Sequence, residues 1–285
     1  MYRKFRFVSA AAVLVFLTIT QFEIQAQEKA VNEKRVGTSA VGLKISGGGT
    51  AAAAEKALSD RVIDLNNLGV ALTAEARHDE AVTAFTEALS LEPTLAAAHV
   101  NLSITYERLG RLSEALESAL DGLELSPGDA RAQNQLCGIY YLSQKFSEAV
   151  NCFETLAKIV PADAEARSQL AAALIRNGQA ERAINLLQEV IAEVPLHAQA
   201  HNSLGFAYFR LKKYASASTA FKRAVEIDPY STLFRFNLGI TQALNKNKPG
   251  ALAQYKALKE ADPDRARKIY NLVYRDKILV VPQPK

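Results

Sequence analysis

Two histidines form the clearest pattern for metal chemistry in this sequence. His197 and His201 are four residues apart, a spacing that puts two imidazoles on one face of a helix, where they could ligate a metal ion. His197, however, follows Pro195 in an expected turn, and His201 falls at an expected helix-packing position that His99 also holds. We therefore expect structural roles for both histidines, and we predict no metal site and no cofactor.

The two cysteines, Cys137 and Cys152, lie in neighbouring expected helices. Two thiols can form a disulfide if a protein is exported to an oxidising compartment. Cys137 should face Ala149, however, and Cys152 lies one helical turn further along. We therefore expect two small, buried or partly exposed thiols, with a disulfide as the alternative.

Motifs for catalysis and phosphate binding are absent from the sequence, which has no glycine-rich phosphate loop, nucleophile elbow or paired acids. The 34 basic and 30 acidic residues give a net charge of +4. A nucleic-acid-binding protein would need a larger excess of positive charge. The sequence predicts a non-enzymatic protein with no small-molecule substrate and no nucleic-acid partner.

The first 26 residues have the order of a secretory signal peptide. Arg3, Lys4 and Arg6 precede an uncharged run over residues 7–20, and Ala26 is a small residue at the expected cleavage point. We expect an exported protein of a bacterial periplasm or cell envelope. The alternatives are secretion, or membrane anchoring if the leader is not cleaved. Residues 27–61 predict a flexible tether, within which residues 50–58 are compatible with a short helix.

A repeat of 34 residues organises the rest of the chain. It is marked by six evenly spaced prolines: Pro93, Pro127, Pro161, Pro195, Pro229 and Pro263. The seventh residue of each unit is leucine: Leu68, Leu102, Leu136, Leu170, Leu204 and Leu238. The eighth is small: Gly69, Ser103, Cys137, Ala171, Gly205 and Gly239. The twentieth is alanine: Ala81, Ala115, Ala149, Ala183, Ala217 and Ala251.

These columns resemble the tetratricopeptide repeat, a helix-turn-helix unit of 34 residues. The resemblance implies an all-α, right-handed superhelical solenoid of antiparallel helix pairs, with a concave groove lined by the first helix of each pair. The expected repeats are residues 62–95, 96–129, 130–163, 164–197, 198–231 and 232–265. A capping helix over residues 266–277 and a tail over residues 278–285 complete the chain.

The sixth residue of each unit faces the groove in proteins of this family, and here it is mostly an amide. The positions are Asn67, Asn101, Gln135, Gln169, Ser203 and Asn237. Amides donate to and accept from an extended peptide backbone, so this ladder predicts peptide binding. The alternative is hydrogen bonding within the solenoid.

Five large apolar residues are expected to face the same groove in the second half of the array: Tyr141, Ile175, Phe206, Phe209 and Phe236. Aromatic anchors often dominate binding energy, so these residues are candidate anchors for a ligand. The alternative is packing between adjacent first helices, which applies most strongly to Tyr141.

Family members that bind chaperone tails hold a terminal carboxylate with five side chains from three repeats. Asn101 and Arg131 match two of these positions, but Asn66, Val70 and Gln135 replace the other three. We therefore expect no such clamp. The sequence predicts an interaction scaffold that binds a protein or peptide partner in its groove. The alternative is a structural or assembly subunit of a cell-envelope complex that uses its convex face or the solenoid ends.

Overall fold

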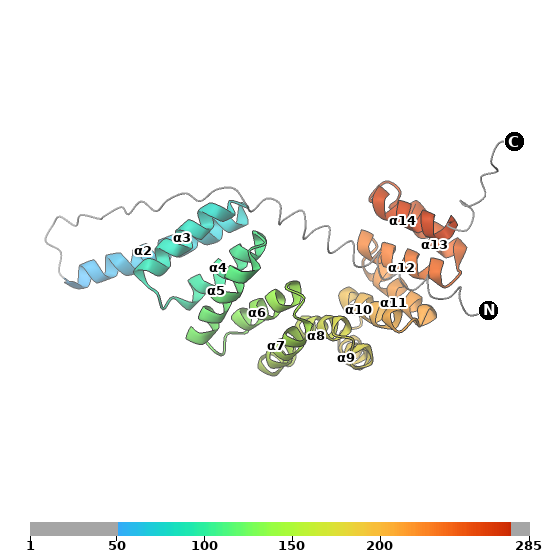
Figure 1. Ribbon diagram of the computed structural model, residues 1–285, viewed down its shortest axis with the longest axis horizontal. Coiled ribbons are helices and arrows are strands. Elements are labelled where there is room, and N and C mark those ends of the chain that lie inside the picture. Colours follow the sequence, from blue (N-terminus) through green and yellow to red (C-terminus); the bar gives the residue numbers. More distant parts are fainter. Residues whose placement is uncertain (1–50, 275–285) are drawn as a thin grey trace. The chain divides into compact units, whose positions relative to one another are not determined.

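The computed structural model describes residues 51–274, which contain thirteen α-helices and no strand (Figure 1). The expected signal peptide, most of the expected tether and the C-terminal tail lie outside the described residues. The helices are α2 (Ala51–Ala74), α3 (His78–Leu91), α4 (Ala96–Arg108), α5 (Leu112–Leu125), α6 (Ala130–Leu142), α7 (Phe146–Ile159), α8 (Ala164–Arg176), α9 (Ala180–Glu193), α10 (Ala198–Arg210), α11 (Tyr214–Ile227), α12 (Thr232–Leu244), α13 (Lys248–Leu258) and α14 (Pro263–Tyr274).

The chain forms two compact units, and the boundary between Gln135 and Leu136 falls within α6. Unit 1 holds α2 to α5 and the first turns of α6, and unit 2 holds the rest of α6 and α7 to α14. Within each unit, consecutive helices pack against one another as antiparallel pairs. The predicted all-α repeat solenoid is confirmed. No helix in residues 51–274 is long and apolar enough to span a membrane.

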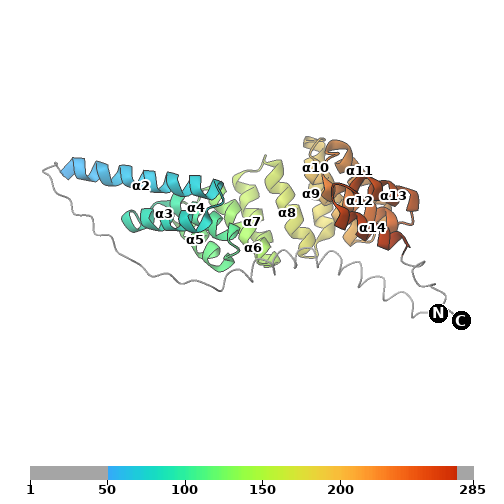
Figure 2. The ribbon, with the colours of Figure 1, turned by 90° about the horizontal axis from the view of Figure 1, so that it is seen from above.

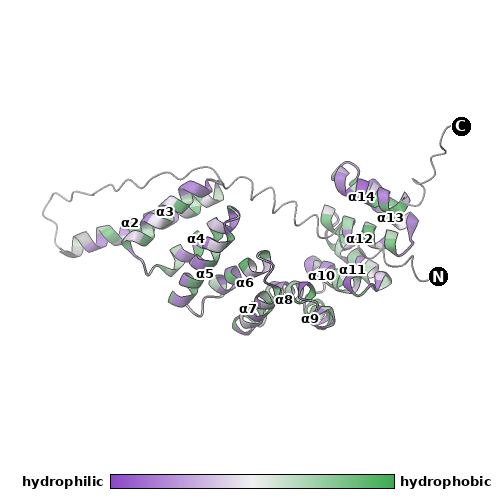
Figure 3. Cartoon of the chain, viewed as in Figure 1, coloured by the Kyte–Doolittle hydropathy of each residue, from purple (hydrophilic) through white to green (hydrophobic). Residues whose placement is uncertain are grey.

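Amphipathic helices and small residues at the contact points explain this packing. Apolar and polar residues alternate along the helices (Figure 3), so that each helix presents an apolar stripe to its neighbours. Ala81, Ala149 and the other alanines at the twentieth position are all fully buried. A Cβ atom on Gly205 would lie 2.6 Å from the Phe221 ring. The eighth position must therefore stay small wherever a large residue of the second helix packs against it.

The turn inside each of the six predicted repeats has the same backbone feature in the described chain. Its fifteenth residue has a positive φ, although it is glycine only at Gly110 and Gly178. The other four are Ala76, Gln144, Lys212 and Lys246. In each turn the N–H of the residue that follows donates a hydrogen bond to the carbonyl oxygen five residues before it, as in Arg77 to Leu72 and Lys213 to Tyr208. This left-handed cap ends the first helix and reverses the chain.

The first helix differs from the expectation. We predicted a tether through residue 61, but α2 is continuous from Ala51 to Ala74 and extends beyond α3 (Figure 2). Alanine-rich residues have a high helix propensity, and a helix already nucleated on α3 extends into them at little cost. Leu68 of α2 is 50% exposed, whereas Leu102 at the same repeat position is buried. No described helix pair precedes α2 to cover Leu68.

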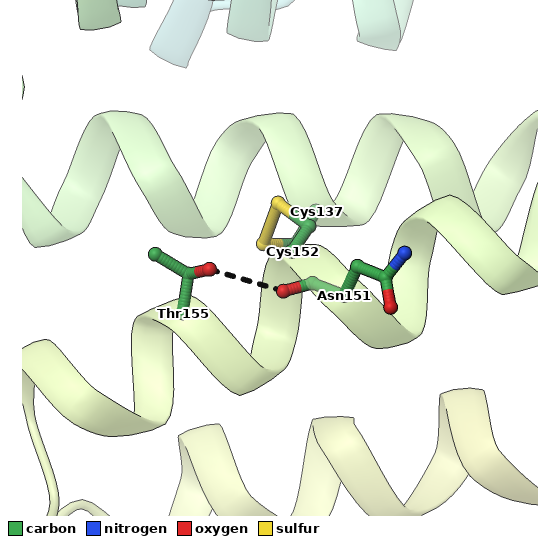
Figure 4. Close-up of a disulfide and its surroundings, with 4 residues drawn as sticks. All are labelled: Cys137, Asn151, Cys152 and Thr155. Carbon is green, nitrogen blue, oxygen red and sulfur yellow. Dashed lines mark hydrogen bonds between the residues drawn. A yellow bond between two sulfur atoms is a disulfide. The ribbon is translucent and has the colours of Figure 1, made fainter.

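Cys137 of α6 and Cys152 of α7 form a disulfide, with 5.2 Å between their Cα atoms (Figure 4). The expectation of two unbonded thiols is therefore wrong. Cys152 lies three residues beyond Ala149, and residues at i and i+3 share one face of a helix. Both Ala149 and Cys152 therefore face α6. The small side chains at this crossing let the two helices approach closely enough for the bond.

Candidate functional site

Two amides of the predicted ladder already form hydrogen bonds with other side chains of the protein. Asn101 donates its Nδ2 hydrogen to Asn66 Oδ1 at 3.0 Å, and Asn237 donates likewise to Asn202 Oδ1 at 2.9 Å. In both pairs the sixth residue of one repeat meets the fifth residue of the repeat before it. Asn101 and Asn237 are also buried. The alternative reading, hydrogen bonding within the solenoid, therefore holds for both.

The other ladder positions differ in what they offer a ligand. Gln135 donates to Glu107 at 2.6 Å, and Gln169 lies 3.4 Å from Glu165. Ser203 is buried. Asn67, by contrast, is exposed, and its side chain forms no hydrogen bond with any described residue. Asn67 is thus the ladder amide best placed to bind a peptide backbone.

Three of the five predicted anchors belong to the core of unit 2. Ile175 and Phe236 are each 1% exposed, and Phe209 is 9% exposed, which leaves little surface for a ligand. Phe209 stacks against Phe206 and meets the edge of Tyr214 with ring centroids 5.5 Å apart. The prediction that these three side chains line a groove is corrected, because neighbouring helices and turns enclose all three.

Tyr141 and Phe206 keep part of their surface. Tyr141 packs edge-on against Phe146, with ring centroids 5.7 Å apart. The Arg176 guanidinium lies 4.6 Å from the centre of the Phe146 ring and 5.9 Å from that of Tyr141. This cation–π contact ties the end of α8 to the turn between α6 and α7.

The first helices of unit 1 carry exposed polar and apolar side chains. There the exposed Arg131 of α6 donates to Asn101 Oδ1, and Asn101 in turn donates to Asn66. Ile63 and Val70 of α2 are about half exposed and lie on the same face as Asn67, at i, i+4 and i+7. We call Ile63, Asn67, Val70, Ile104 and Arg131 the unit 1 face. Their repeat positions, second, sixth and ninth, share one side of the first helices.

Sequence reasoning found only part of this face. It named Asn67 as a ligand residue, but it treated Arg131 as a match to a lost clamp and Val70 as a replacement for a clamp residue, and it left out Ile63. Helical spacing from the sixth position could have identified the second and ninth positions. The 35-residue separation within Asn66–Asn101 and Asn202–Asn237 could likewise have revealed the internal amide pairs.

Three of the four histidines form hydrogen bonds with backbone groups. His201 Nε2 lies 3.0 Å from the Pro195 carbonyl oxygen, and His99 Nε2 lies 3.0 Å from that of Pro93. His197 Nδ1 accepts a hydrogen bond from the N–H of Ala200 and caps α10. Within residues 51–274, no three His, Cys, Asp or Glu side chains are placed to hold a metal ion.

Surface ion pairs lower the pKa of two carboxyl groups, those of Glu80 and Glu193. Arg77 donates two hydrogen bonds to Glu80, and these lower the pKa of that carboxyl. Arg167 does the same to Glu193 across the ends of α8 and α9. These pairs join neighbouring helices and turns at the surface, so we assign them a structural role.

Comparison with known proteins agrees with the geometry. Two family models, both described as tetratricopeptide repeat, match residues 72–136 and 168–232. No curated protein sequence matches the chain significantly. Among solved structures, a tetratricopeptide repeat protein from Parabacteroides merdae superposes with a TM-score of 0.68 at 15% identity, covering 77% of this chain and 88% of that one.

Two further structures have the same fold. Pseudomonas aeruginosa pilF superposes with a TM-score of 0.61 at 15% identity, covering 75% of this chain and 98% of that one. A chain from the APC/C Cut9–Hcn1 hetero-tetramer gives 0.63 at 16% identity, covering 76% and 43%. At these identities the likeness shows the fold alone. The 34-residue repeat, the paired helices and the two family matches together show that the chain is a tetratricopeptide repeat protein.

Proposed function

We propose that this protein captures an extended peptide or protein segment on the unit 1 face. Tetratricopeptide repeats serve in general as scaffolds for protein–protein interaction, and the repeat family is generally non-enzymatic. The observation that carries the proposal is the combination on one surface of an amide with no described partner, Asn67, two exposed apolar side chains, Ile63 and Val70, and an oriented cation, Arg131.

The three kinds of group have complementary roles. Asn67 offers a donor and an acceptor to a peptide backbone. Ile63 and Val70 offer apolar surface that a ligand side chain would remove from water. Arg131 offers guanidinium hydrogens to a carboxylate or carbonyl oxygen, and its bond to Asn101 fixes its direction before a ligand arrives.

We further propose that the protein works outside the cytosol, in the periplasm or cell envelope of a bacterium. The charged and apolar order of residues 1–26 supports export. The disulfide between Cys137 and Cys152 supports it independently, because such bonds persist in oxidising compartments.

Site-specific photo-crosslinking in the native host tests the binding face. A photoreactive residue at Val70 should trap a partner, whereas one at Thr83, exposed on α3 of the same unit, should not. With the trapped partner purified, Arg131→Gln should weaken binding by about 1 to 3 kcal/mol in titration calorimetry. Equal cross-linking at the two positions, or unchanged affinity of the Arg131 variant, would contradict the proposal.

A second candidate function, an assembly subunit of an envelope complex, is favoured by a different observation. Large apolar side chains protrude from one edge of unit 2, including Leu196 and Tyr230. Exposed apolar side chains that gather on one surface commonly mark a site of association.

A further inference from the structure

The two edges of unit 2 carry charges of opposite sign. One edge holds the turns within repeats, residues 142–148, 176–182, 210–216 and 244–250, and we call it the basic edge. It has eight basic and two acidic side chains, a net charge of +6.

The other edge of unit 2 holds the turns between repeats, residues 159–165, 193–199, 227–233 and 261–267, and we call it the acidic edge. It has six acidic and two basic side chains, a net charge of −4. The two sets of turns lie at opposite ends of the helices because consecutive first helices run in the same direction.

The cations of the basic edge are largely without carboxylate partners. Lys145, Arg210, Lys212, Lys213 and Lys246 are exposed, and none forms an ion pair with a residue of the described chain. Between them lie half-buried aromatic rings, Phe146 and Tyr141 at one turn and Tyr214 at another. This edge therefore offers unneutralised positive charge next to shallow aromatic surface.

The acidic edge carries protruding apolar side chains. Tyr230 is 91% exposed and Leu196 is 69% exposed, at the same position of two successive turns between repeats. Ile159, Val194 and Leu233 are exposed beside them. On the same turns, Asp163 and Asp228 accept backbone hydrogen bonds and Glu165 lies 3.5 Å from His197. The other three carboxylates are paired with arginines: Glu193 with Arg167, Asp262 with Arg265 and Asp264 with Arg267. Most of the large apolar side chains exposed in the described part of unit 2 thus gather on its negatively charged edge.

We propose that the acidic edge of one molecule docks on the basic edge of a second copy of this chain. The edges complement each other in charge, and the protruding Leu196 and Tyr230 of one would cover the half-buried rings of the other. Apolar side chains at the centre of a contact, ringed by opposite charges, are the usual anatomy of a protein interface. The inference goes beyond the proposed function, because it uses the edges of unit 2 and leaves the unit 1 face open.

A lipid surface fits these edges less well. Attachment to an anionic membrane combines cations with apolar side chains that insert between the headgroups. In unit 2 the protruding apolar side chains lie mainly on the edge that anionic lipids would repel.

The proposed contact is head-to-tail, since each molecule uses two different surfaces. Such contacts do not close on themselves unless the rotation between copies forms a ring, so association should continue beyond the dimer. Because opposite charges steer and stabilise the contact, added salt should weaken it.

Sedimentation velocity tests this self-association directly, with the mature protein purified from its host. At about 50 mM NaCl the wild type should associate with rising concentration, and at about 500 mM its dissociation constant should rise about tenfold or more. An acidic-edge variant, Leu196→Ser with Tyr230→Ser, and a basic-edge variant, Lys212→Asn with Lys213→Asp, should each sediment as a monomer. The substitutions suit their sites, because Asn tolerates the positive φ of residue 212 and Asp is a good N-cap for α11.

Mixing the two variants gives the decisive result. Each keeps one intact edge, so the mixture should form a dimer that grows no further. Matched controls keep the wild-type association: Lys222→Gln with Arg223→Glu changes the net charge equally on α11, and Leu120→Ser with Leu125→Ser removes exposed leucines from α5. A wild type that remains a monomer up to about 1 mM, a variant that associates normally, or a mixture that stays monomeric overturns the proposal.

Discussion

Removing the disulfide between Cys137 and Cys152 should destabilise unit 2 by about 3 kcal/mol. The two cysteines are 15 residues apart in the sequence. Closing a loop of this size removes conformational freedom from the unfolded chain, and the chain-entropy model assigns it about 3 kcal/mol at 25 °C. For a unit of this length, that loss corresponds to a fall in Tm of about 6 to 12 °C.

The repeat itself supplies a variant that isolates this effect. Alanine already stands at the position of Cys137 in the next repeat, as Ala171, and at the position of Cys152 in two other repeats, as Ala84 and Ala220. A Cys137→Ala, Cys152→Ala double variant therefore keeps side chains that the fold accepts at this crossing. The packing loss should add only about 1 kcal/mol.

Urea denaturation followed by circular dichroism distinguishes the bond from the packing. The oxidised wild type should unfold at the highest urea concentration and the reduced wild type at a lower one. The double-alanine variant should unfold slightly below the reduced wild type, because its packing loss adds about 1 kcal/mol. Reductant should not change the double-alanine variant, which has no bond to break. A double-alanine variant as stable as the oxidised wild type would refute the entropic argument, and free thiols in the protein isolated from its host would refute the bond itself.

Two further substitutions test the core of unit 2 by urea denaturation. Phe209→Ala should destabilise by about 3 kcal/mol, because the ring is buried against Tyr214; unchanged stability would mean that the ring faces solvent. Gly205→Ala should destabilise by about 1 to 3 kcal/mol, because its Cβ would lie 2.6 Å from the Phe221 ring. Gly138→Ala is the matched control: apart from its chain neighbours and the nearby backbone of α6, no described atom lies within 4 Å of the new Cβ, so the higher helix propensity of alanine should leave stability equal or up to about 1 kcal/mol higher. Equal effects of the two glycine substitutions would contradict the packing assigned to the eighth position.

The positions that could be predicted from the sequence are those that repeat with one residue type. The alanine column from Ala81 to Ala251 is fully buried, as its spacing indicated. The turn at the fifteenth position was missed, because the same left-handed backbone is built from glycine in only two repeats. Backbone hydrogen bonds of the turn itself, such as Arg77 N–H to Leu72 and Lys213 N–H to Tyr208, hold Ala76 and Lys212 in a conformation that their own preferences disfavour.

The candidate site was harder to predict, because family position says which way a residue faces but not what covers it. Phe209 and Phe236 were expected in a groove, yet large rings at these positions are enclosed by the next turn and helix. The disulfide was missed for a related reason. The sequence placed Cys137 opposite Ala149, but it did not show that Cys152, on the same face of α7, lies within bonding distance.

The contacts between repeats explain why the exposed amide, Asn67, lies in unit 1. At the sixth position, Asn101 and Asn237 each donate to an asparagine of the preceding repeat, and both are buried. Asn67 occupies the same position, but no described helix pair precedes α2, so neither its amide nor the neighbouring Leu68 is covered. The residue type that locks later repeats together is therefore available to a ligand at the first. On the binding proposal, surface for a ligand arises where the described stack of repeats ends, and a partner's backbone would contact Asn67, with Ile63 and Val70 on the same helix, at the place that a preceding repeat takes elsewhere.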